Sequence, residues 1–252
     1  MHPSEPRLLI VSSVALDRNA QLAALVSEIR SQADAFVFLS GGAAKMHEDH
    51  QRQLLAMFDA LALIASSGRR IAVGDGGTRA GIMEAAGNAR RATGRAFPLI
   101  GVAPAGEIPP RGRTPIDPNH SHLVAVDSPS APATDSWGSE TGTMYWLFAK
   151  LAEGRPSVTI VANGGGITLQ EIEANLRAGR PMILIEGSGR AADALVSLLN
   201  GTAPSDPDVV DLRLKAERAG LTSRPELLQV VPLQAGATGL RDAVTAAFDR
   251  TR

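Results

Sequence analysis

The sequence predicts an α/β fold with a doubly wound, mostly parallel, Rossmann-like sheet and helices on both of its faces. Short apolar runs alternate with segments of helical periodicity along the chain, and three of these runs end in glycine clusters. The 252 residues suffice for one large α/β domain or two small ones. Because crossovers between parallel strands are right-handed, the connecting helices are expected to cover both faces.

The elements follow from where apolar residues gather and where they recur at helical spacing. The apolar run 8–11 predicts the first strand, and Leu22, Leu25 and Ile29 on one face predict the helix after it. Strands are expected at 7–13, 35–39, 71–73, 99–102, 123–126, 158–161, 182–185 and, at the edge, 228–233. Helices are expected at 17–31, 48–66, 79–92, 140–152, 169–178, 191–199, 209–219 and 239–248.

Two segments interrupt the alternation of strands and helices. Residues 103–122 are rich in Gly, Pro and Arg and are too long for an ordinary connection, which predicts a functional loop. Residues 201–207 are polar and contain proline. We therefore expect a nucleotide-binding domain at 7–200 and a C-terminal helical extension at 201–252 that packs on the same domain.

Composition excludes several classes of function. The net charge of −1 gives no bulk attraction to nucleic acid or to an anionic membrane. The absence of cysteine excludes disulfides, thiolate metal sites and a Cys nucleophile. No stretch approaches the roughly 20 apolar residues of a membrane span, and the N-terminus lacks the features of a signal peptide. A cytoplasmic protein is therefore expected.

The glycine clusters are the strongest functional signal. Glycine allows close approach of the backbone to a ligand, and a helix N-terminus just after a strand attracts anions, so a phosphate-bearing ligand is expected at the carboxyl edge of the sheet. The candidate binding residues in these clusters, together with the glycine pair after the strand at 35–39, are Gly41, Gly42, Gly76, Gly77, Thr78, Gly164, Gly165, Gly166, Thr168, Gly187, Ser188, Gly189 and Arg190. Arg190 is the expected anion clamp, and a salt bridge to Asp193 or to another surface acid is its structural alternative.

Glu171 has two interpretations. One turn into the helix after the 164–168 cluster, its carboxyl group is placed to face a ribose or to act as an acid or base. Alternatively, Thr168 caps the helix and Glu171 is its capping-box partner. Glu84 is a second candidate catalytic carboxylate, if the protein is an enzyme.

Other motifs point less clearly to a site. Residues 187–192 fit the dinucleotide pattern G-x-G-x-x-A, but the acidic residues downstream lie in a Pro-containing loop, which disfavours a standard NAD dehydrogenase. No Walker A sequence occurs. Asp117, His120 and His122 form a polar cluster, yet their spacing does not predict a metal site, and none is expected.

Six motifs in one order resemble a known family. They are Gly76-Gly77-Thr78 with Gly81 and Met83, then 100–104, Asp117–His120, Trp137–Glu140, Gly164–Thr168 and Glu186–Asp193. Over roughly residues 7–200 this order is similar to the SLOG domain at the N-terminus of TRPM (melastatin) cation channels and in their prokaryotic relatives. The wider superfamily includes the DprA/Smf proteins and the lonely-guy phosphoribohydrolases. Residues 164–171 resemble the latter's signature, with Ile167 at a glycine position.

The resemblance implies a Rossmann-like domain that senses a nucleotide such as ADP-ribose or an NAD derivative. By motif, Gly77 and Thr78 would contact phosphate or ribose, and Gly189 with Arg190 would hold a second phosphate. The same comparison adds Pro104, Asn119, His120 and Glu140 as pocket residues. After the Glu140 position the channel members carry Arg, whereas this chain has Met144, Tyr145 and Trp146, so adenine stacking on an aromatic side chain is an alternative there.

Two functions therefore compete. The favoured one is a nucleotide-binding sensor that needs no cofactor besides its small-molecule ligand. The alternative is a nucleotide N-glycosidase, similar to the phosphoribohydrolases, that uses Glu171 or Glu84 on an oxocarbenium-like transition state. A DNA-binding module is disfavoured by the charge, so no nucleic-acid or membrane partner is expected. A second copy of the chain and an effector protein both remain open as partners.

Overall fold

The computed structural model describes residues 6–42, 45–46, 48–127 and 136–250. These residues build one eight-stranded sheet in the order β1-β5-β4-β3-β2-β6-β7-β8. All seven pairings between neighbouring strands are parallel, so the predicted α/β Rossmann-like fold is confirmed. The strands are β1 (Arg7–Ser12), β2 (Ala35–Gly41), β3 (Ile71–Asp75), β4 (Leu99–Pro104), β5 (His122–Asp127), β6 (Ser157–Ala162), β7 (Met182–Glu186) and β8 (Leu228–Pro232).

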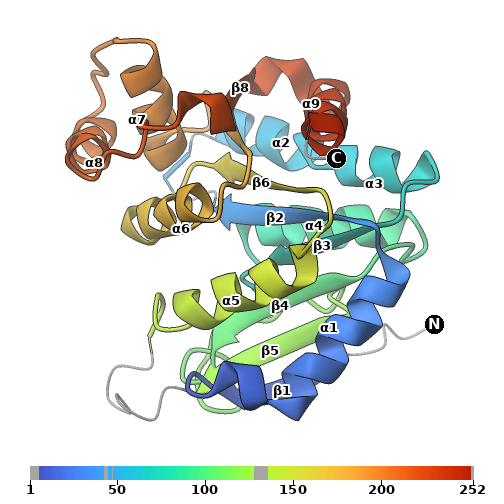
Figure 1. The fold of residues 1–252 in the computed structure, drawn as a ribbon. Coiled ribbons are helices and arrows are strands. Elements are labelled where there is room, and N and C mark those ends of the chain that lie inside the picture. Colours follow the sequence, from blue (N-terminus) through green and yellow to red (C-terminus); the bar gives the residue numbers. More distant parts are fainter. Residues whose placement is uncertain (1–5, 43–44, 47, 128–135, 251–252) are drawn as a thin grey trace.

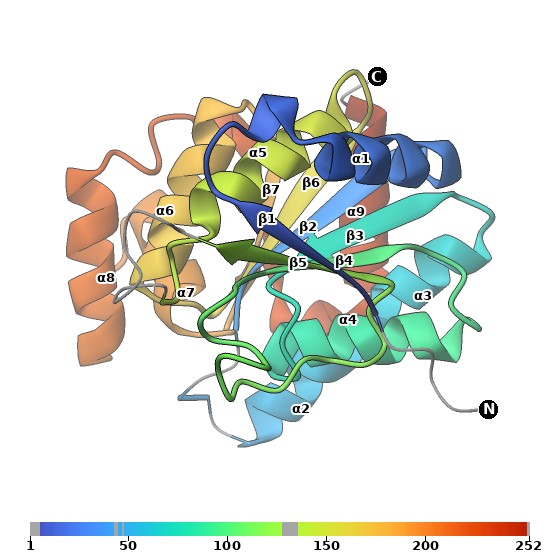
Figure 2. The same cartoon turned by 90° about the horizontal axis from the view of Figure 1, so that it is seen from below.

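Helices cover both faces of this sheet (Figures 1 and 2). Helices α1 and α5 lie on one face, and α2, α3, α4 and α9 lie on the other. The helices are α1 (Ala20–Gln32), α2 (Glu48–Met57), α3 (Asp59–Ser66), α4 (Gly81–Ala92), α5 (Thr141–Ala152), α6 (Gly166–Arg177), α7 (Arg190–Leu199), α8 (Pro207–Arg218) and α9 (Gly236–Arg250). Short 3-10 turns lie at Leu16–Arg18, Pro225–Leu227 and Leu233–Ala235.

The central strand β2 is apolar from Ala35 to Leu39, because both of its faces are buried. Phe36 and Phe38 point to the α1 and α5 side, where they join a core with Phe148. Val37 and Leu39 point to the opposite core, formed with α2, α3, α4 and α9. Burial of each such side chain stabilises the fold by about 1.5–3 kcal/mol, and the two cores hold the helices against the two faces of the sheet.

The single helix predicted at 48–66 is wrong in one respect, because the structure divides it into α2 and α3 at Phe58. The Phe58 amide bonds the Leu55 carbonyl, and the Leu61 amide bonds the Phe58 carbonyl, so both bonds span three residues instead of four. Phe58 is fully buried in the same core as both helices. Tertiary packing of this aromatic ring thus overrides a continuous helical pattern.

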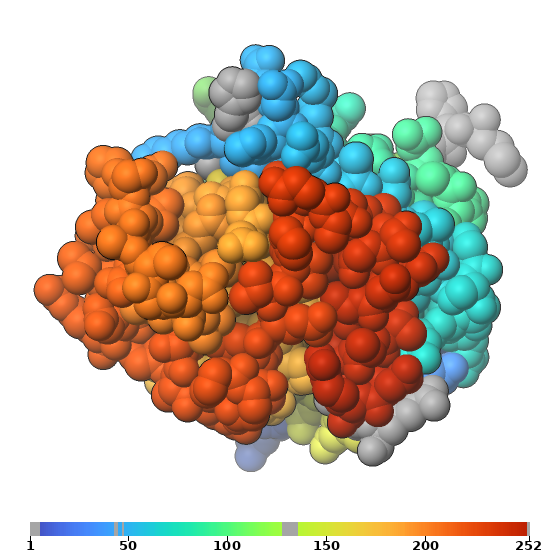
Figure 3. Space-filling model, turned by 90° about the horizontal axis from the view of Figure 1, so that it is seen from above, coloured from blue at the N-terminus to red at the C-terminus, as the bar shows by residue number. Residues whose placement is uncertain are grey.

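The C-terminal residues continue the same sheet. β8 pairs with β7 along its length, and α9 contributes Leu240, Val244 and Phe248 to the core beneath α2 and α3. In Figure 3 the C-terminal surface, orange to red, adjoins that of α2 and α3 in blue and cyan. The edge strand predicted at 228–233 is therefore confirmed. No helix in the described part of the chain has the length and apolar character needed to cross a bilayer.

The order in which successive strands are added to the sheet reverses between β2 and β6. After β2, strands β3, β4 and β5 follow on one side, whereas β6, β7 and β8 follow on the other. In open α/β sheets, ligands bind outside the carboxyl ends of the strands at such a reversal. The glycine turns after β3, β6 and β7 all lie at this edge, as predicted, because these strands are parallel.

Candidate functional site

A cavity of about 330 Å³ opens at the carboxyl edge where β2 and β6 lie side by side. Ten of the residues predicted from the sequence line it: Gly41, Gly42, Gly76, Glu140, Gly164, Gly165, Gly166, Thr168, Glu171 and Arg190. Six further residues complete its wall: Leu39, Met83, Trp137, Met144, Asn163 and Ile167. The structure thus brings together segments that are more than one hundred residues apart in the sequence.

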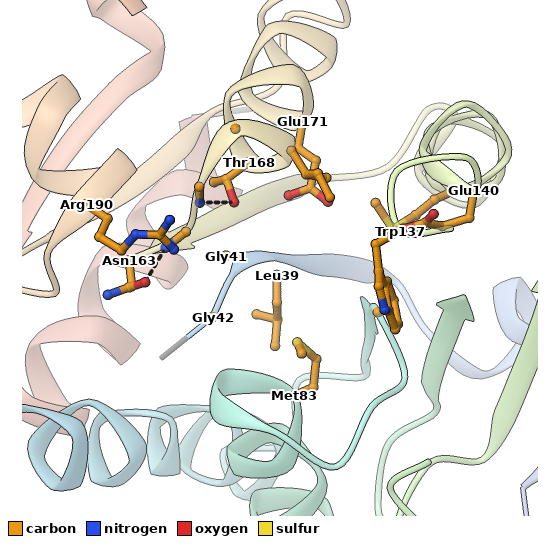
Figure 4. Close-up of a pocket in the computed structure, with 16 residues that line it drawn as sticks. Leu39, Gly41, Gly42, Met83, Trp137, Glu140, Asn163, Thr168, Glu171 and Arg190 are labelled. Carbon is orange, nitrogen blue, oxygen red and sulfur yellow. Dashed lines mark hydrogen bonds between the residues drawn. The ribbon is translucent and has the colours of Figure 1, made fainter. Parts of the chain in front are cut away.

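The loop between β6 and α6 forms one wall with its backbone. Gly164 has a φ of +86°, and a Cβ there would lie 2.4 Å from the Thr168 hydroxyl oxygen. The Gly165 amide donates to that hydroxyl at 3.2 Å, and the Gly164 amide donates to the Asn163 side chain at 2.7 Å (Figure 4). The positive end of the α6 dipole therefore lies at the cavity, an arrangement that attracts anions.

The capping interpretation of Glu171 is wrong, because Gly165 is the cap of α6 and Thr168 is its box partner. Glu171 instead points from the next turn of the helix toward the cavity, where it is only 8% exposed. The Ser40 hydroxyl donates a hydrogen bond to its carboxylate. Burial and the neighbouring Glu140 raise the pKa of Glu171 to about 7, against the opposing effect of that hydrogen bond.

A buried polar network holds α6 behind this carboxyl group. The Asn175 amide group donates to the Glu171 carbonyl at 2.8 Å and to the Tyr145 hydroxyl at 3.0 Å. Its oxygen accepts from Thr159 at 2.8 Å and from the Arg180 guanidinium at 2.7 Å. These bonds connect α6 with α5 and β6, so the orientation of Glu171 is fixed from behind.

Arg190 supplies the cationic side chain of the cavity. It begins α7 with a φ of 49°, a left-handed conformation that non-glycine residues rarely adopt. A Cβ on Gly165 would lie 3.0 Å from the Arg190 guanidinium, so the missing side chain at Gly165 leaves room for this group. Its nearest carboxylate is that of Asp208, 3.8 Å from Nε, which is the surface acid of the alternative interpretation and not Asp193.

Asp193 has a different role from the predicted salt bridge. Its two carboxylate oxygens accept the amides of Gly187, at 2.8 Å, and Gly189, at 3.1 Å. The Ser188 hydroxyl donates to the Ile185 carbonyl and accepts the Asn163 amide at 2.8 Å. The backbone amides of residues 187–189 are thus occupied within the protein, and Arg190 alone among residues 187–190 lines the cavity.

The remaining candidates lie away from the cavity. Gly77 and Thr78 are buried beside the 105–121 loop, and the Gly77 amide donates to Asp75 at 2.7 Å. Glu84 lies on α4, 3.7 Å from Arg79. Neither Pro104 at the end of β4 nor Asn119 lines the cavity.

His120 belongs to a buried charge cluster beneath the Gly76 turn. Its Nε2 lies 2.7 Å from Asp75, and its Nδ1 lies 3.2 Å from the Asp117 carbonyl. Burial would lower the pKa of His120, but the charges and hydrogen bonds of Asp75 and Asp117 outweigh it and raise the pKa to about 9. The cluster therefore holds the turn and the 105–121 loop together. Among the described residues no group of three or more potential ligands could hold a metal ion.

The cavity's aromatic side chain is Trp137, which the sequence motif included but the candidate set did not. Neither Tyr145 nor Trp146, the aromatic residues on which an adenine was expected to stack, lines the cavity. Tyr145 is engaged with Asn175, and the Trp146 indole donates to Asp17 at 3.2 Å on the outer side of α5. In Figure 4, Arg190 and Asn163 lie at one end of the cavity, Trp137 and Glu140 at the other, and Glu171 between them.

A protein-family model matches most of the chain. The family model described as "SLOG in TRPM, prokaryote" covers residues 34–240, which is most of the chain and includes all of the residues that line the cavity. No curated protein matches the chain significantly. Membership supports a nucleotide-related ligand-binding domain in general. The chain belongs to the prokaryotic family of SLOG domains related to those of TRPM.

Proposed function

We propose that this protein is a nucleotide sensor that binds a phosphate-bearing ligand in the cavity at the β2–β6 reversal. The class includes ADP-ribose and NAD derivatives. The observation that carries the proposal is the convergence of the α6 N-terminus, the Arg190 guanidinium, two carboxylates and the Trp137 ring on one cavity. The helix N-terminus and the guanidinium group recognise a phosphate, the carboxylates recognise sugar hydroxyls, and the indole ring recognises a planar base. The sensor is proposed to act in the cytoplasm, with the nucleotide as its only required ligand.

Thermal unfolding in the presence of nucleotides tests this proposal. The panel consists of AMP and the other nucleoside monophosphates, ADP-ribose, cyclic ADP-ribose and NAD. A ligand present at 100 times its Kd adds about 2.7 kcal/mol to the free energy of unfolding, which corresponds to a shift of several degrees in Tm. A flat response to the whole panel, repeated by calorimetry, would refute nucleotide binding.

One observation favours a second candidate, a nucleotide N-glycosidase. A carboxyl group with a pKa of about 7 inside a ligand cavity is suited to donate or accept a proton at neutral pH. Glu171 is the candidate catalytic residue, because Glu84 lies outside the cavity. Ile167 lines the cavity where the hydrolase signature has glycine, and its side chain narrows the approach to the α6 backbone.

Product analysis separates the two functions. A sensor releases no free base from any nucleotide in the panel, whereas a hydrolase releases base in the wild type and none in Glu171→Gln. The matched control is Glu173→Gln, which changes an exposed carboxylate on the same helix that is paired with Arg177. Base release by the wild type and the control, lost only in Glu171→Gln, would establish the enzyme.

A further inference from the structure

The charges of the cavity are arranged in an order that restricts which nucleotide can bind, if the proposed function is correct. Figure 4 shows Arg190 at one end, the Glu171 carboxyl group in the middle, and Trp137 with Glu140 at the other end. A ligand that spans the cavity must match this order along its own length.

The anion-binding groups are confined to one end. Arg190 is the only cationic side chain among the described residues that line the cavity. The N-terminus of α6 lies beside it, because the Arg190 guanidinium fits over Gly165 at the start of that helix. A doubly charged phosphate is favoured there by the helix dipole and by a charge-assisted hydrogen bond.

The middle of the cavity disfavours a second phosphate. Glu171 lies in the middle, and Glu140 at the far end lies close enough to help raise its pKa, so this stretch of the cavity already resists additional negative charge. Carboxylates accept hydrogen bonds and suit donors such as the hydroxyl groups of a ribose. A pyrophosphate in this position would face Glu171, with Glu140 beyond it, and none of the described residues that line this part of the cavity is cationic.

The far end suits a planar, uncharged group. Trp137 is half-buried, and Met83 and Leu39 line the same cavity from α4 and β2. The turn that bears Trp137 is fixed, because the Gly138 amide donates to the Glu140 carboxylate at 2.8 Å. A nucleobase that stacks on an aromatic ring binds about 5- to 150-fold more tightly than it does after the ring is replaced by alanine.

We propose that the cavity selects a ribonucleotide with one terminal phosphate, bound with its phosphate at Arg190, its ribose hydroxyls at Glu171 and Glu140, and its base on Trp137. A nucleotide whose pyrophosphate lies between two sugars, such as ADP-ribose, places its charge against the acidic middle. The volume of about 330 Å³ agrees with one nucleoside and one phosphate, since it is at the lower end of the range for ligand pockets, about 300–1,000 Å³.

Calorimetric titration of the full chain tests this selection. The probes are the four nucleoside 5′-monophosphates, the matching 2′-deoxynucleotides, ribose 5-phosphate and ADP-ribose. We expect the best monophosphate to bind at least about tenfold more tightly than ADP-ribose and than its own 2′-deoxy form. Tighter binding of ADP-ribose would overturn the inference and leave the proposed function intact, whereas no binding of any nucleotide would overturn both.

Two variants test the placement of the ligand. Trp137→Ala should weaken the monophosphate about tenfold or more and leave ribose 5-phosphate unchanged, because the latter has no base. The matched control, Trp146→Ala, removes the indole on the outer side of α5 and should change neither affinity. Glu140→Gln should narrow the preference for the monophosphate over ADP-ribose. An equal loss of affinity for monophosphate and ribose 5-phosphate in Trp137→Ala, or an unchanged preference in Glu140→Gln, would contradict the proposed order.

Discussion

Replacement of Glu171 by Gln should stabilise the folded protein at neutral and alkaline pH. The pKa of this carboxyl group rises from 4.5 to about 7 on folding, chiefly through burial. A carboxyl group with a raised pKa binds more protons in the folded state than in the unfolded one between these two values. The free energy of unfolding therefore falls as pH rises from 4.5 to 7, and the full loss applies above 7.

The shift corresponds to a loss of about 3 kcal/mol, since one pKa unit equals about 1.4 kcal/mol. Glutamine keeps the shape and still accepts the Ser40 hydroxyl, but it carries no charge. The stability difference between Glu171→Gln and the wild type should thus change by about 3 kcal/mol in favour of the variant between pH 4.5 and pH 8. For a chain of this size, that change amounts to about 6–12 °C in Tm.

Urea denaturation at pH 4.5 and pH 8 measures this difference directly. Each curve is recorded for the wild type, Glu171→Gln and Glu173→Gln, the last as a control for loss of an exposed carboxylate on the same helix. The control should keep the pH dependence of the wild type. If the stability difference between Glu171→Gln and the wild type is equal at both pH values, Glu171 does not titrate as the geometry requires.

Three further predictions concern charges around the cavity. The raised pKa of His120 means that its interaction with the two carboxylates stabilises the fold fully below pH 6.5, and that about 3 kcal/mol of this stability is lost as pH rises to about 9. This loss should be absent in His120→Gln, as measured by urea denaturation at both ends of the pH range. Arg190→Gly should relieve the strain of the left-handed backbone and stabilise the fold by up to about 1 kcal/mol. The same variant should bind the nucleotide roughly tenfold more weakly or worse, because a charge-assisted hydrogen bond is lost. Wild-type affinity of this variant in calorimetry would show that Arg190 does not bind the ligand. Asp208 lies 3.8 Å from Arg190 and pairs with Lys45 at 2.6 Å, so its carboxylate competes with a bound phosphate for Arg190. Asp208→Asn should therefore increase nucleotide affinity about threefold at low salt. The control Asp211→Asn, which changes a carboxylate paired with Lys215, should leave the affinity unchanged.

The fold could be predicted from the sequence because its signals are local. Strands buried on both faces are continuous apolar runs, as in Phe36–Leu39, and each helix repeats apolar residues on one face. The break at Phe58 could not be predicted in this way. It depends on which core the ring enters, and the flanking residues keep the pattern of one helix.

The glycine clusters could be assigned to the cavity, but the direction of single side chains could not. Trp137 and Trp146 are close in the sequence, yet only the first faces the cavity, because the start of α5 at Thr141 places them on opposite sides. The sequence around Gly187 and Gly189 is typical of a loop whose backbone amides bind phosphate. Asp193, one turn into α7, occupies both of them, and this contact depends on backbone geometry that a motif does not encode.

Two residues of the cavity, Arg190 and Glu171, lower the stability of the fold, and both carry groups that a ligand can compensate. Arg190 has a positive φ, a left-handed conformation that costs on the order of 1 kcal/mol at a long side chain. Glu171 is buried where its ionised form is disfavoured. A loop selected for stability alone would carry glycine at position 190 and an amide or apolar residue at position 171. The positions 164–166 beside this side chain are already glycine, so the retained guanidinium and carboxyl groups are best explained by a ligand that compensates them. Bound nucleotide should therefore stabilise the wild type more than it stabilises Arg190→Gly at equal ligand concentration.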